Sequence, residues 1–285
     1  MNGFKEFSKL SLKSGLWFCF YLLAQTFSGI LLFIVKISTD KSFVRRFMEL
    51  FAPIYRDSSG YSIEKNYEVL NLFNHLMDNF VNETLLITGI IIICFALVRF
   101  KSNNNELVND KNSSLTKRET LLLLIGGVCF NIIISAFIYF LVPSGVISDY
   151  SSSIEGITTS EMWLINLISM GIVTPVVEEI VFRYGIMGCF IGVNPALAIS
   201  YQAILFATVH GSPIQMVYTF VLGITFGYLT YKTRSILPSI LLHISLNSST
   251  IIVSNMFSNN EFVGLFYSIF VIIISFYIAN HFKKN

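Results

Sequence analysis

Apolar runs of near-bilayer length follow one another along the chain, separated by polar or charged stretches. A transmembrane helix needs roughly 20 consecutive apolar residues. Eight runs approach this length: residues 15–35, 83–100, 119–142, 162–191, 195–210, 213–231, 236–256 and 262–282. Because backbone polar groups in lipid must be satisfied within the segment, such runs favour helices. The pattern predicts an all-α, polytopic membrane protein with a bundle of about eight transmembrane helices.

The stretches between the runs suggest how the single membrane domain is organised. Residues 1–160 are expected to hold the N-terminal helices, with a mixed-charge segment, 36–82, forming short amphipathic helices on the membrane. Residues 101–118 are rich in Asn and Lys and are expected to form a flexible loop. Residues 161–256 carry the chemistry-bearing helices, and 257–285 hold a last helix and a basic C-terminus.

Composition agrees with this pattern. The chain is 54% hydrophobic and only 13% charged, whereas soluble domains have about a quarter of charged residues. No basic face typical of nucleic-acid binding is present, so the expected partners are membrane lipid and not nucleic acid. The four cysteines are Cys19, Cys94, Cys129 and Cys189; each is isolated in its own apolar run, which argues against a disulfide framework or a cysteine metal site.

The distribution of positive charge predicts the orientation. Lys and Arg gather before the first run, between the second and third, between the sixth and seventh, and after the eighth. With eight spans all these positions fall on one side, and the positive-inside rule assigns that side to the cytoplasm. Both termini of this cell-membrane protein are therefore expected to be cytoplasmic.

One apolar run carries charges in its middle. The segment SMGIVTPVVEEIVFRYGIMGCFI, residues 169–191, contains Glu178, Glu179 and Arg183. Ionisable side chains inside a membrane are costly, and they usually mark a functional site. Glu179 and Arg183 are one helical turn apart and are expected to pair. Glu178 is rotated about 100° from Glu179 and is expected to face something else.

Two later runs supply polar partners. F-A-T-V-H places Phe206 and His210 one turn apart, and H-I-S-L-N places His243 and Asn247 on one helical face. Glu178 and His210 both lie about 20 Å from the turn that joins their runs, so they can share a depth. His243 matches this depth if those two runs project beyond the bilayer, and Arg183 would then snorkel to the interface.

The residue types leave several chemistries open. A carboxylate and an imidazole at one wet cavity can activate water by general base catalysis. A second His and an Asn can stabilise the oxyanion of a tetrahedral intermediate. A carboxylate with two imidazoles is also a ligand set for a divalent metal. Spacing alone does not separate these options.

The three motifs together resemble a known family. E-E-x-x-x-R at Glu178, F-x-x-x-H at Phe206 and H-x-x-x-N at His243 occur in order on separate runs. This set, with flanking phrases such as TPVVEEIVFR, is similar to the CAAX-protease and bacteriocin-processing (CPBP, or Abi) intramembrane proteases, which include type II CAAX prenyl endopeptidase. The resemblance spans roughly residues 162–255, and residues before it carry no such motif.

The resemblance implies a role for each motif residue. Glu178 would be the base that activates water, His210 its partner in proton transfer, and His243 with Asn247 the transition-state stabilisers. Glu179, Arg183 and Phe206 would support the site. The family is described as metalloproteases, although a metal-independent glutamate mechanism is also argued. The latter is favoured here, with zinc left open and, if used, held by Glu178, His210 and His243.

The resulting hypothesis is an intramembrane endopeptidase of the CPBP family. It would hydrolyse a peptide bond of a membrane-associated, lipidated or transmembrane peptide in CAAX-type processing, peptide or bacteriocin maturation, or self-immunity. Two alternatives come from other classes: a non-enzymatic membrane immunity or regulatory protein, and an ion- or proton-coupled transporter whose Glu178 relays protons.

Overall fold

The computed structural model describes residues 2–55, 63–102, 115–141 and 163–257, and within these ranges the chain is helical and contains no strand. The predicted all-α class is confirmed. The predicted span at 262–282 lies outside the described residues. Most of the predicted loop at 101–118 does so as well.

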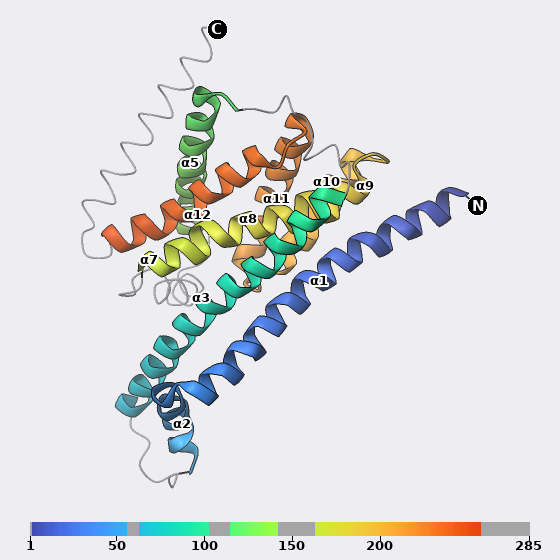
Figure 1. Cartoon of the computed structure of the whole chain (residues 1–285). Helices are drawn as coiled ribbons and strands as arrows, with labels where there is room; N and C mark the ends of the chain where they lie inside the picture. The colour runs from blue at the N-terminus through green and yellow to red at the C-terminus, as the bar shows by residue number, and fades with distance from the viewer. Residues whose placement is uncertain (1, 56–62, 103–114, 142–162, 258–285) are drawn as a thin grey trace.

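The N-terminal part is built from three helices: α1 (Asn2–Thr39), α2 (Lys41–Tyr55) and α3 (Ile63–Ser102). Asp40 begins α2 by accepting hydrogen bonds from the backbone N–H groups of Ser42 and Phe43, at 2.9 and 3.0 Å. These bonds, with one from the Ser42 hydroxyl, hold the pKa of Asp40 below its usual value. α1 and α3 then run side by side (Figure 1).

The interpretation of residues 36–82 as short surface helices is only partly correct. α2 is a separate amphipathic helix, but α3 continues without a break from Ile63 through the predicted second span. The apolar face of α2 packs on both neighbouring helices. The rings of Phe43 and Phe47 lie 6.1 and 5.4 Å from that of Phe33 in α1, and the Phe43 ring lies 6.5 Å from that of Phe80 in α3.

α5 (Lys117–Leu141) starts with a capping box, in which Thr116 and Glu119 exchange backbone and side-chain hydrogen bonds. The next described segment is a single rod of five successive elements. They are α7 (Trp163–Asn166), η1 (Leu167–Val173), α8 (Thr174–Glu178), η2 (Glu179–Met187) and α9 (Gly188–Phe190), of which η1 and η2 are π-helical. π-helical turns are rare and occur frequently at functional sites.

Three further helices complete the described core: α10 (Pro195–Thr208), α11 (Pro213–Thr233) and α12 (Leu237–Phe257). Asn194 caps α10 by accepting from the Leu197 N–H at 3.1 Å. Between α10 and α11 the chain turns at Gly211, whose φ of +70° suits glycine. α12 contacts α5, α11, η1 and α8, while α10 contacts α11 and η2.

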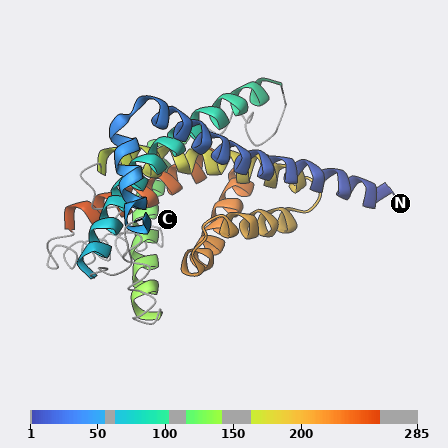
Figure 2. The same cartoon turned by 90° about the horizontal axis from the view of Figure 1, so that it is seen from below.

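The rod from α7 to α9 is therefore the central element of the bundle. It contacts α1 and α3 on one side and α10, α11 and α12 on the other (Figure 1). Viewed from below, the N-terminal end of α1 extends beyond the other helices (Figure 2). Half of the rod's residues are buried within the described structure, a higher share than in any other helix long enough to cross a membrane.

Six described helices are long and apolar enough to cross a membrane, which corresponds to predicted spans one to four, six and seven. The fifth predicted span is shorter than expected, because α10 ends at Thr208 and the chain turns at residues 209–212 before α11. The protein is a multi-pass integral membrane protein, as predicted. The orientation of its termini stays a prediction.

Glycine allows the close approach of α5 and α12. A Cβ on Gly127 would lie 2.6 Å from the Leu242 carbonyl oxygen and 2.7 Å from the Leu246 backbone nitrogen. We expect Gly127→Ala to separate the two helices and to lower the free energy of unfolding by about 1–3 kcal/mol. Thermal unfolding in detergent, followed by circular dichroism, measures this loss.

The matched control is Gly15→Ala in α1, where a Cβ would meet no atom within 4 Å. This substitution should leave the unfolding temperature unchanged or raise it slightly, because alanine favours helices. Equal unfolding temperatures for the Gly127 and Gly15 variants would contradict the packing described for α5 and α12.

Candidate active site

The two adjacent glutamates lie at the junction of α8 and η2, in the most buried part of the rod. Glu178 ends α8 and Glu179 begins η2, with exposed fractions of 6% and 0%. Arg183 follows one turn later and is also 0% exposed. Burying charged groups is expensive unless they are paired. The geometry around each glutamate shows how this cost is offset.

Glu179 and Arg183 form the predicted ion pair, with 3.1 Å between Arg183 Nε and Glu179 Oε2. Arg183 does not snorkel to the interface, contrary to expectation. Its guanidinium instead lies over the rings of Phe206 and Phe226, 4.5 and 5.3 Å from their centroids. Its two terminal nitrogens have no hydrogen-bond partner in the described chain. The guanidinium instead makes cation–π contacts with the two ring faces.

His243 lies against both glutamates. Its Nδ1 is 2.9 Å from Glu179 Oε1, and its Nε2 is 3.6 Å from Glu178 Oε2. Because the Glu179 carboxylate also pairs with Arg183, we take its Oε1 as the acceptor and Nδ1 as the donor. Nε2 is then directed at Glu178. Glu178 thus faces a partner other than Arg183, and the same imidazole from α12 also contacts Glu179.

Phe206 is fully buried and brings the two histidines together. Its ring lies 4.8 Å from that of His210 and 5.9 Å from that of His243, both in edge-to-face geometry. His210 Nδ1 is 2.7 Å from the Phe206 carbonyl oxygen, which can only accept, so Nδ1 donates and Nε2 is left without a partner in the described chain. No direct hydrogen bond or ion pair joins His210 to Glu178 among the described residues.

Asn247 is one turn beyond His243 on α12 and contacts the rod at another point. Its Nδ2 donates to the Met170 carbonyl oxygen at 3.2 Å, and the neighbouring Ser248 hydroxyl donates to the Gly171 carbonyl oxygen at 3.1 Å. Its role as a transition-state stabiliser stays a prediction. In this structure its amide holds α12 against η1.

Pro175 explains why these two carbonyls accept from outside the rod. Proline has no N–H, so it cannot donate to Gly171 four residues earlier or to Met170 five residues earlier. The N–H of Thr174, which would otherwise serve Met170, donates to Ser169. The side chains of Asn247 and Ser248 therefore satisfy carbonyls that the proline leaves open.

A zinc site would need several ligating side chains that converge on one point. No three His, Cys, Asp or Glu side chains in the described ranges converge as a metal ion requires. The ligand set suggested for zinc, Glu178, His210 and His243, is not gathered in that way. No step is therefore assigned to a metal here.

Sequence reasoning missed Phe226 and Ser248. The Phe226 ring lies 4.9 Å from that of His243 and also contacts the Arg183 guanidinium. A phenylalanine in an apolar helix does not indicate a functional site, because most such residues only fill the core. Ser248 could have been found from its place beside Asn247, combined with the missing donor at Pro175.

A family comparison bears on the readings that geometry leaves open. Residues 160–249 match the family model described as "Type II CAAX prenyl endopeptidase Rce1-like". These residues form an Rce1-like region. It contains Glu178, Glu179, Arg183 and both site histidines, so the resemblance drawn from the three motifs is confirmed. The match supports a CAAX-type intramembrane protease, which acts on a peptide or protein substrate in a membrane.

A curated relative extends beyond the Rce1-like region. The chain is 27% identical over 188 residues to the UPF0177 protein YajF of Lactococcus lactis subsp. lactis (strain IL1403). The alignment covers 64% of this chain and 83% of that protein. No solved structure gives a significant match.

Because Glu179 and Arg183 form a buried ion pair, removing one charge should destabilise the protein more than removing both. Arg183→Met leaves Glu179 without its cation in a buried site, and breaking a buried pair costs about 3–5 kcal/mol. We expect this variant to lose that much stability, measured by chemical or thermal unfolding in detergent. The double variant Glu179→Gln/Arg183→Met removes both charges and should recover most of the loss.

Equal destabilisation of the single and double variants would contradict this account of the pair. Arg183→Lys is a second control, because lysine keeps the charge but lacks the planar guanidinium that lies over Phe206 and Phe226. It should fall between the wild-type protein and Arg183→Met.

Proposed function

We propose that this protein is an intramembrane endopeptidase in which Glu178 activates water to hydrolyse a peptide bond. The observation that carries the proposal is the buried contact of Glu178 with an imidazole whose far side is fixed by Glu179. A carboxylate can act as a general base, and an imidazole held beside it can donate a hydrogen bond to the charge that develops. The Rce1-like match of the same residues supports the reaction class.

The positions of the two glutamates support a donor role for His243. Its Nδ1 lies 2.9 Å from Glu179 Oε1 and its Nε2 lies 3.6 Å from Glu178 Oε2, so an acceptor lies beside each ring nitrogen. A proton on Nε2 would then lie beside Glu178, from where Nε2 can donate a hydrogen bond to a developing oxyanion.

The proposed reaction runs in two steps. Glu178 takes a proton from water while the water oxygen bonds to the scissile carbonyl carbon, and the resulting oxyanion accepts a hydrogen bond from His243 Nε2. The C–N bond then breaks as the departing nitrogen takes the proton held by Glu178. His210, whose Nε2 has no partner in the described chain, is proposed to return protons between this site and water.

Asn247 is proposed as a second stabiliser of the oxyanion, as its motif implies. Its amide is held at Met170 in the structure, so this role requires the amide to exchange its present acceptor for the substrate. The substrate is proposed to be a membrane-associated, lipidated or transmembrane peptide. Peptide or bacteriocin maturation and self-immunity are the processes this chemistry fits.

The test compares membranes that contain wild-type protein or Glu178→Gln, using peptidomics of cleaved products. Glutamine keeps the shape of glutamate but cannot take a proton, so general base catalysis should fall by about 100-fold or more. We expect specific cleavage products to disappear with Glu178→Gln while the amount of inserted protein stays the same. A parallel sample with chelator reports the need for a metal.

Glu83→Gln is the matched control, since Glu83 pairs with Lys36 at 2.8 Å, away from the site residues. It should leave the products unchanged. Unchanged products with Glu178→Gln would reject the protease mechanism and favour the non-enzymatic immunity role. Proton-coupled flux in vesicles that Glu178→Gln abolishes, without any cleavage, would favour the transporter.

A further inference from the structure

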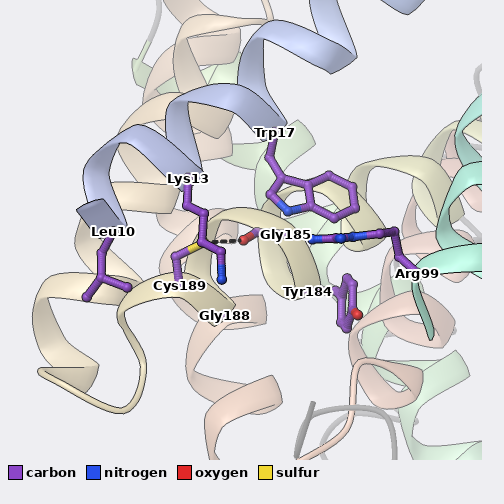
Figure 3. Close-up of a pocket in the computed structure, with 8 residues that line it drawn as sticks. All are labelled: Leu10, Lys13, Trp17, Arg99, Tyr184, Gly185, Gly188 and Cys189. Carbon is purple, nitrogen blue, oxygen red and sulfur yellow. Dashed lines mark hydrogen bonds between the residues drawn. The ribbon is translucent and has the colours of Figure 1, made fainter. Parts of the chain in front are cut away.

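A polar cavity lies apart from the acid cluster, where α1, the end of α3 and the end of the rod meet (Figure 3). Its volume is about 210 Å³. None of the proposed site residues lines it. The lining residues are Leu10, Lys13, Trp17, Arg99, Tyr184, Gly185, Gly188 and Cys189.

Two cations face this cavity without a carboxylate partner. Lys13 comes from α1 and Arg99 from α3, and both side chains are exposed. Neither forms an ion pair with any acidic residue in the described ranges. Figure 3 shows Arg99 extending toward Gly185 and Lys13 extending toward Gly188. Two positive charges that share one space favour an anion between them.

Aromatic residues form the wall of the cavity. The indole of Trp17 lies directly against Gly185, where a Cβ would be only 2.5 Å from the indole ring. Trp17 also meets Tyr184 edge-to-face, with 5.9 Å between ring centroids. The absence of a side chain at Gly185 thus lets α1 approach η2. This contact fixes Lys13, one turn before Trp17, on the face that borders the cavity.

The cavity lies at the ends of three membrane spans. Arg99 is the last residue of the span Phe80–Arg99, and Cys189 is the last but one of the span Trp163–Phe190. Lys13 is the last charged residue before an uninterrupted run of 22 uncharged residues in α1. Tryptophan and tyrosine are enriched at this depth, where lipid headgroups lie.

We propose that this cavity binds the phosphate of an anionic phospholipid, with Lys13 and Arg99 as its charge partners. Basic pockets between transmembrane helices at the membrane surface bind anionic headgroups. Trp17 and Tyr184 would contact the part of the lipid next to the phosphate. The cavity has room for several water-sized groups at ~30 Å³ each, which is enough for a phosphate. A zwitterionic lipid is disfavoured because its own cation would meet Lys13 and Arg99.

The full chain offers its own reporter for the test. It has two tryptophans, Trp17 and Trp163, so Trp163→Phe leaves the cavity residue as the single fluorophore. In this background and in neutral detergent, Trp17 emission is followed while short-chain phosphatidylglycerol is added. Parallel titrations use phosphatidylcholine of equal chain length and inorganic phosphate.

We expect saturable binding of phosphatidylglycerol and a Kd about 25-fold higher in Lys13→Gln/Arg99→Gln. Each basic residue near an anionic lipid surface contributes about 1 kcal/mol, and 1.4 kcal/mol is tenfold. The matched control is Lys41→Gln/Arg45→Gln, which removes two exposed charges from α2 and should leave the Kd unchanged. Lys13→Gln alone should raise the Kd about fivefold, and it keeps the test decisive if the double variant unfolds.

Three results would overturn the proposal. Equal affinity for phosphatidylcholine would show that anionic charge is not recognised. Saturation by inorganic phosphate at the same concentration as lipid would assign the site to a soluble anion. An equal loss of affinity in the α2 control would show a general effect of net charge and not a site.

Discussion

The structure depends on how two adjacent carboxylates are kept inside a membrane helix. A buried carboxylate is tolerated only with a cation and with hydrogen bonds that satisfy its oxygens. Glu179 has an ion pair with Arg183 of its own helix through Oε2 and a hydrogen bond with His243 of α12 through Oε1. Within the described residues, the ion-pair contact of Glu178 is with His243, at 3.6 Å. This asymmetry leaves Glu178 as the carboxylate with capacity for a further partner, the position that the proposed base occupies.

The surroundings of the cluster follow from that requirement. Arg183 is covered by Phe206 and Phe226, whose ring faces stabilise its charge. Phe206 also contacts both histidines, and Phe226 contacts His243. The aromatic residues therefore fix the relative placement of α10, α11 and α12 around the rod. At the other end of α8, Pro175 leaves two carbonyl groups without a backbone donor. Asn247 and Ser248 of α12 donate hydrogen bonds to these carbonyl oxygens. The same helix is thus anchored on both sides of Glu178.

Much of this arrangement could be predicted from the sequence. Apolar runs predicted the helices, because a backbone in lipid has few alternatives to the helix. The spacing of Glu179 and Arg183 predicted their pair, and the three motifs predicted the Rce1-like region. Spacing could not predict which residues of different helices come into contact. Nothing local indicates that His243 contacts Glu179 as well as Glu178, since 64 residues separate His243 from Glu179. Arg183 was expected at the interface because charge on a helix does not reveal which aromatic rings will cover it. α10 was predicted too long because the turn at Gly211 follows a run that stays apolar up to His210.

The central claim is that Glu179 holds His243 through Nδ1 and so directs Nε2 at Glu178. The most direct measurement is nitrogen NMR of protein labelled with ¹⁵N-histidine, in which the chain's four histidines are assigned by single substitutions to glutamine. The account predicts a proton on Nδ1 of His243, in a hydrogen bond whose signal shifts in Glu179→Gln and not in Glu83→Gln. A neutral His243 with its proton on Nε2 alone, unaffected by Glu179→Gln, would contradict it.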